Sequence, residues 1–136
     1  MTERSEPDRV TVDERLARFL VAGRWIRSDQ TIRPDAFIPY PYPNLSATRH
    51  KNISEQELWQ IGKDVADALT KVLHGRADFR ASAVRRHALE VEPNPVPGNP
   101  NHANVVGWPA EKPAQKIIAQ QIAAECKFVR GPVPAA

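Results

Sequence analysis

The chain has 136 residues with 41% hydrophobic and 26% charged side chains, which is typical of one globular domain and not of a disordered chain. Its net charge of +3 is too small to indicate nucleic-acid binding by itself. No apolar run approaches the roughly 18 residues of a membrane span, and the start lacks the order of a secretion signal. We therefore expect a cytoplasmic protein with no membrane partner.

The first third of the chain predicts a helix, an extended segment and a strand. Leu16, Phe19 and Leu20 recur at helical spacing, which predicts a helix over residues 12–22. Four prolines between residues 34 and 43 remove backbone donors, so this segment is expected to be extended and outside a central strand. Residues 45–50 then alternate in polarity and predict a strand.

A long helix is predicted over residues 55–73. Ser54 and Glu57 have the spacing of a capping box, in which each side chain binds the backbone amide of the other residue. The expected buried stripe is Leu58, Ile61, Val65, Leu69 and Val72, and Gly75 is the expected C-terminal stop.

The second half predicts shorter elements. The segment 76–91 fits two short strands, 77–79 and 89–91, around a helical turn at 82–87. A loop rich in proline and asparagine follows, and residues 102–107 predict another strand. Pro113 suits the first turn of a last helix with the expected buried stripe Ile117, Ile118, Gln121, Ile122 and Cys126. Residues 128–129 are expected to add a short strand.

Together these elements predict an α+β fold, with a small mixed or antiparallel sheet of three to five short strands covered by two or three helices. We expect a single domain over residues 11–130, between a flexible N-terminus at 1–10 and a flexible C-terminus at 131–136.

Polar clusters at predicted strand and helix ends supply candidate catalytic residues. If their strands are neighbours, Arg49, Arg76 and His102 meet on one concave face, with Asp78 close by and Trp108 as a wall. Arginine binds phosphate or carboxylate bidentately and histidine transfers protons, so such a pocket would suit an anion. The alternative is structural: Arg76 pairs with Asp78, Arg49 is a solvated charge and His102 binds a loop carbonyl.

The run from Pro39 to Pro43 predicts a polyproline II ribbon. Its tyrosines, Tyr40 and Tyr42, are candidates for stacking on bases or entering a partner's groove. The alternative is a strap over an apolar patch, which the preceding residues 37–38 favour because they need burial.

Arg80, Arg85 and Arg86 belong to a locally basic stretch and are candidate contacts to nucleic-acid phosphates. The small net charge favours the alternative of a solvated face. We expect no metal and no cofactor, because the histidines show no i, i+4 pair, Cys126 stands alone, and no phosphate-loop motif occurs.

Three segments resemble those of a set of small bacterial proteins with no established activity: LSATR at 45–49, GRAD at 75–78 and NHANVVGWP at 101–109. The likeness runs from about Ala36 to Ala124. It implies a bacterial cytoplasmic protein with an accessory role and transfers no activity.

No feature of the sequence meets the minimum requirement of a known reaction class, so we expect a non-catalytic accessory domain that binds a protein partner. One alternative is a small enzyme that acts on a phosphorylated or nucleotide substrate through the Arg/His pocket. A second is a weak nucleic-acid-binding module. The enzyme hypothesis requires Arg49, Arg76 and His102 to share a face.

Overall fold

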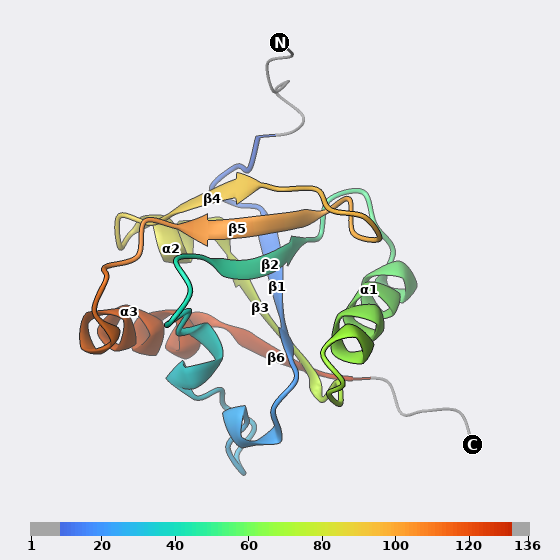
Figure 1. Ribbon diagram of the computed structural model, residues 1–136, viewed down its shortest axis with the longest axis horizontal. Helices are drawn as coiled ribbons and strands as arrows, with labels where there is room; N and C mark the ends of the chain where they lie inside the picture. The colour runs from blue at the N-terminus through green and yellow to red at the C-terminus, as the bar shows by residue number, and fades with distance from the viewer. Residues whose placement is uncertain (1–8, 132–136) are drawn as a thin grey trace.

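The computed structural model describes residues 9–131, and a six-stranded antiparallel sheet with the strand order β4-β5-β2-β1-β3-β6 lies at its centre (Figure 1). The strands are β1 (Arg15–Leu20), β2 (Leu45–Arg49), β3 (Gly75–Arg80), β4 (Glu90–Pro93), β5 (His102–Val106) and β6 (Lys127–Arg130). The described helices are α1 (Glu55–Ala68), α2 (Ala81–Arg85) and α3 (Lys112–Glu125), with 3-10 turns η2 (Gly23–Trp25) and η3 (Pro34–Phe37). The predicted α+β class is confirmed, and the sheet has one strand more than expected.

The additional strand is β1, and the helix predicted over residues 12–22 is wrong. β1 lies between β2 and β3, and both of its faces are covered. Leu16 and Leu20 enter one core, and Ala17 and Phe19 enter the other. A strand buried on both sides loses the polar alternation that usually marks a strand, so its apolar residues mimic helical spacing.

The two faces of the sheet pack against different elements. On the first face, Leu16 and Val105 join the main core, which also takes Phe37 from η3 and Ile122 from α3. On the second face, Ala17 and Phe19 pack against α1. Figure 1 shows α1 and α3 on opposite sides of the strands. We call the second face the α1 face.

Helix α1 begins as predicted and ends earlier than predicted. The amide of Glu57 donates to Ser54 Oγ and the amide of Ser54 donates to the Glu57 carboxylate, each at 3.1 Å, so the capping box is confirmed. The helix ends at Ala68 because Thr70 turns to a left-handed φ of 57°. Gly75 therefore starts β3 and is not the helix stop.

Gly62 sets the distance between α1 and the sheet. A Cβ atom at this position would lie 2.6 Å from the Phe19 ring, so only glycine allows the helix to approach so closely. The α1 face is consequently tightly packed at Phe19.

The other predicted helices and strands form, with one shift of a buried stripe, but the segment 34–43 is not extended as predicted, because it contains η3 and a turn from Pro39 to Tyr42. The strands predicted at 45–50, 77–79, 89–91, 102–107 and 128–129 are present, as is the turn of helix between them. In α3 the predicted stripe is right for Ile118, Ile122 and Cys126, which pack in the main core, and wrong for Ile117 and Gln121, which are exposed, while Ala119 and Ala123 are buried in addition. Small side chains face η3, because the two elements pack closely there.

Val10 is buried in the main core, so the folded part starts before the predicted boundary at residue 11. Residues 1–8 and 132–136, which make up most of the predicted flexible ends, lie outside the described residues. Among the described helices, none has the length and apolar character needed to cross a bilayer.

Candidate functional site

The pocket predicted from Arg49, Arg76 and His102 does not form. Arg49 pairs in register with Leu16 and projects from the first face, where its guanidinium binds the Glu14 carboxylate at 2.5 and 2.8 Å. Arg76 and His102 project from the α1 face, but two strands, β1 and β2, separate β3 from β5. Local patterns do not determine this strand order.

The other members of that predicted pocket also have structural roles. Trp108 packs against the main core, and its Nε1 donates to the Val105 carbonyl at 3.0 Å. His102 Nδ1 lies 2.9 Å from the Asn94 carbonyl, in agreement with the structural alternative.

Arg76 forms the buried part of a network that joins α1 to the sheet. It is 3% exposed, and it binds Asp78 at 2.9 Å and the Glu55 carboxylate at 2.7 and 2.9 Å. The Trp59 ring covers it, with 4.7 Å between the guanidinium carbon and the ring centroid. Burial opposes the charge, but the hydrogen bonds to Glu55 and Asp78 outweigh it and raise the pKa of Arg76. Arg76 is therefore fully occupied inside the protein.

Asp78 also holds His50, the residue that follows β2. His50 Nε2 lies 3.1 Å from Asp78 Oδ1, and the ring reaches across β1, where Ala17 leaves room beside Asp78. Burial alone would raise the pKa of Asp78, but hydrogen bonds from His50 and Arg76 outweigh it and lower the pKa. An ionised Asp78 thus fixes the imidazole, and the other ring nitrogen, Nδ1, makes no hydrogen bond to a described residue.

Three cationic or ionisable side chains lie next to one another at this end of the sheet, and we call His50, Arg15 and Arg80 the basic row. The amide of His50 donates to the Arg15 carbonyl at 3.1 Å, and Arg15 is the register partner of Arg80. Like charges directly opposite each other on two strands are unfavourable. Arg80 donates to the backbone carbonyl of Asp13 at 2.7 Å, and the Arg15 side chain binds no described residue. Neither arginine has a carboxylate partner among residues 9–131.

Two adjoining cavities share Arg15 and Arg80. The first, of about 510 Å³, contains His50 and Lys51 and is lined by polar residues alone. The second, of about 390 Å³, adds Lys127 and Arg86. Arg15 and Arg80 therefore line both cavities, and each cavity contains two further cations, Arg9 and Lys51 in the first and Arg86 and Lys127 in the second.

The carboxylates that line these cavities are mostly neutralised by arginines. Glu14 binds Arg49, Asp78 binds Arg76, and Glu125 binds Arg86. The remaining acid is Asp13, whose backbone carbonyl accepts the bond from Arg80. The cations without a carboxylate partner are Arg15, Lys51, Arg80 and Lys127. This end of the sheet should attract anions.

The other predicted arginines lie outside this group. Arg85 binds Glu90 at 2.8 Å and the Val10 carbonyl, so it acts as a structural tie. Arg80 is the one member of the predicted basic stretch that reaches the basic row. Sequence reasoning missed Arg15 because it lay in a predicted helix, and it noted His50 and Lys51 only as part of a polar strand end.

The predicted polyproline II ribbon does not form: the amide of Tyr42 donates to the Pro39 carbonyl at 2.9 Å, so residues 39–42 make a turn, and this tyrosine turn is partly packed. Phe37 is fully buried, whereas Tyr40 is 52% and Tyr42 is 72% exposed. The amide of Tyr40 donates to the Gln115 side chain at 3.1 Å, and Lys112 lies over the Tyr40 ring. The tyrosine turn is thus fixed to α3 while both rings are exposed to solvent. Tyr40 and Tyr42 stay candidate binding residues.

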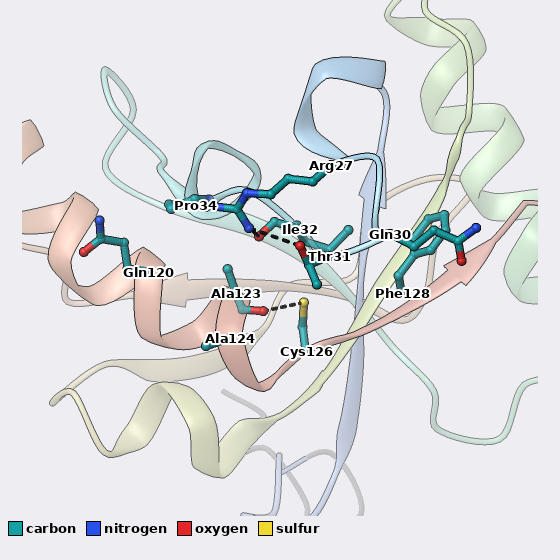
Figure 2. Close-up of a pocket in the computed structure, with 10 residues that line it drawn as sticks. All are labelled: Arg27, Gln30, Thr31, Ile32, Pro34, Gln120, Ala123, Ala124, Cys126 and Phe128. Carbon is teal, nitrogen blue, oxygen red and sulfur yellow. Dashed lines mark hydrogen bonds between the residues drawn. The ribbon is translucent and has the colours of Figure 1, made fainter.

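A third cavity, of about 440 Å³, contains Cys126 and Arg27 (Figure 2). Arg27 is bound to Thr31 and the Ile32 carbonyl, and the Cys126 thiol donates to the Ala123 carbonyl at 3.1 Å. Burial raises the pKa of Cys126 to about 12, which makes it a poor nucleophile. Across residues 9–131 no three side chains of the metal-binding types come together.

Comparisons of the chain with protein-family models, curated proteins and solved structures find no match, so the basic row rests on its geometry alone.

Proposed function

We propose that the protein is a non-catalytic binding domain for a partner that carries phosphate groups, which bind at the basic row. The observation that carries the proposal is the cross-strand pair of Arg15 and Arg80, in which neither guanidinium has a carboxylate partner. A bound anion between them would turn a repulsive pair into an attractive one.

Phosphate is the anion that this chemistry favours. The planar fork of arginine matches phosphate oxygens with two parallel hydrogen bonds, and Lys51 adds a flexible point charge from the first cavity. Asp13 lines the first cavity and opposes an anion, whereas Glu14, Asp78 and Glu125, the other acids of the two cavities, are each paired with an arginine. A domain with exposed cations and no assembled nucleophile suits binding better than catalysis.

A titration of labelled protein with pyrophosphate, followed by amide chemical shifts, tests this function. Shift changes are expected near Arg15 and Arg80, and the variant Arg15→Ala/Arg80→Ala should lose them. The matched control is Arg24→Ala/Arg33→Ala, which removes two exposed arginines whose side chains bind no described residue. Equal responses of the two variants, or no response of the parent protein, would refute the proposal.

His50 favours a second function, that of a small enzyme acting on phosphate esters. Asp78 orients its ring, and its unbonded Nδ1 belongs to the side chain that lines the first cavity. An oriented imidazole beside bound phosphate is the arrangement of a general base. Hydrolysis of nitrophenyl phosphate esters that disappears in His50→Asn would support this function, and no turnover by the parent protein would reject it.

A further inference from the structure

We infer that the phosphate-bearing partner is a nucleic acid, whose sugar-phosphate backbone lies across both cavities and is bound without recognition of the bases. This inference rests on the function proposed above and specifies the class of partner. It concerns the four cations that lack a carboxylate partner: Arg15, Lys51, Arg80 and Lys127.

The four cations extend over more of the sheet than one phosphate group can cover. Lys51 follows β2, Arg15 starts β1, Arg80 ends β3 and Lys127 starts β6, and these four strands are adjacent in the sheet. Strands lie about 4.8 Å apart, so the four cations extend over roughly 14 Å. A single phosphate group spans much less than this, whereas a nucleic-acid strand rises about 3.4 Å per nucleotide and offers several phosphates over the same distance.

The shape and lining of the first cavity also favour an extended, charged ligand. The first cavity is wide open to solvent and lined by charged and polar residues, whereas sites for small molecules usually enclose their ligand. A ligand held here stays solvated and is held by charge, as a phosphate backbone is. A compact phosphorylated metabolite would leave either Lys51 or Lys127 unused.

These two cavities offer no exposed aromatic ring on which a base could stack. The aromatic side chains that line them are His50, which is 11% exposed and held by Asp78, and Phe79, which is 3% exposed and packs edge-on against Phe37. Proteins that prefer single strands usually stack bases on exposed aromatic rings. We therefore expect sequence-independent binding in which a duplex, with its higher charge density, binds at least as tightly as its separate strands.

The salt dependence of binding measures the number of phosphate contacts. Four contacts to a duplex predict a slope of about −3.6 for the logarithm of the association constant against the logarithm of salt concentration. At physiological salt the dissociation constant should be about 1–100 μM, the range of non-specific complexes.

The experiment is fluorescence anisotropy of a labelled mixed-sequence DNA duplex, its two single strands and a labelled phosphopeptide between about 50 and 200 mM salt. Lys127→Ala should reduce the duplex slope by about 0.9 and Arg15→Ala/Arg80→Ala by about 1.8, while Arg24→Ala/Arg33→Ala leaves it unchanged. A second duplex of different sequence should bind equally.

The outcomes separate this inference from the proposed function. If the phosphopeptide or pyrophosphate binds at the basic row as tightly as the duplex, the nucleic-acid inference is overturned and the proposed function stands. Strong preference for one base sequence, or a slope that Lys127→Ala does not change, also overturns the inference. If no phosphate compound binds, both fail.

Discussion

Arg76 and Arg80 lie on the same strand, project from the same face of the sheet and have different surroundings. Arg76 is enclosed by two carboxylates and the Trp59 ring, whereas Arg80 is exposed and binds a single backbone carbonyl. The first turn of α1 makes the difference, because Glu55 and Trp59 cover one arginine and leave the other uncovered. Two arginines of one strand face therefore differ in availability: Arg76 is used within the fold, and Arg80 remains accessible for the anion binding proposed above.

The largest expected effect comes from Asp78→Ala. This change leaves the buried Arg76 and His50 without their shared partner, so the free energy of unfolding should fall by about 3–5 kcal/mol. Urea unfolding measures it. Arg80→Ala is the companion variant, with an expected change within about 0.5 kcal/mol. Similar losses in the two variants would contradict the division between the two arginines.

The next effect concerns anion affinity. Arg15→Ala/Arg80→Ala removes two exposed charges and should weaken pyrophosphate or DNA binding by about tenfold. Its unfolding free energy should stay the same or rise slightly, since a like-charge pair is removed. Calorimetric titration and thermal unfolding give the two quantities. A clear loss of stability would show that the pair is structural.

A smaller effect is expected from acid. The pKa of Asp78 is lowered in the folded protein, so its stabilising contribution is complete above the ordinary value of 3.8 and is lost as the pH falls through the folded pKa. The stability advantage of the parent protein over Asp78→Asn should therefore shrink below about pH 4. Unfolding curves at several pH values measure it, and an advantage that is constant down to pH 2 would contradict it.

The smallest effect is expected from Glu55→Gln. Glu55 is largely exposed although it binds Arg76, and hydrogen bonding to Arg76 lowers its pKa. Solvent screens such a contact, so the expected loss of stability is about 0.5 kcal/mol. A loss comparable to that of Asp78→Ala would mean that Glu55 and Asp78 contribute equally to stabilising the buried charge of Arg76.

The elements that were predicted correctly are those whose ends or faces depend on neighbouring residues in the sequence. The capping box at Ser54 identified the start of α1, alternation identified β2, and β5 also forms where a strand was predicted. Alternation also predicts that Arg49 and His50 lie on opposite faces of the sheet. The predicted pocket included Arg49, which lies on the first face, and left out His50, which lies on the α1 face with Arg76 and Asp78. The sequence pattern carries no information on the order β5-β2-β1-β3, which separates His102 from Arg76.

The candidate site depended on the one element that was assigned wrongly. Arg15 joins the basic row only when residues 15–20 form a strand between β2 and β3. Apart from Arg15 and Arg18, the residues of that strand are apolar on both faces, so nothing in the local spacing distinguishes it from a buried helix. Tertiary packing decided the conformation.

The position of β1 has a consequence for synthesis on the ribosome. This strand leaves the ribosome before either neighbour, and its second neighbour is complete only when residue 80 has been added. Its apolar side chains therefore stay exposed during elongation until both neighbouring strands have been synthesised. Nascent chains with such exposed apolar segments associate with chaperones or with each other. Arg15 and Arg18, charges on an otherwise apolar segment, would help to keep this early stretch dissolved until β3 arrives.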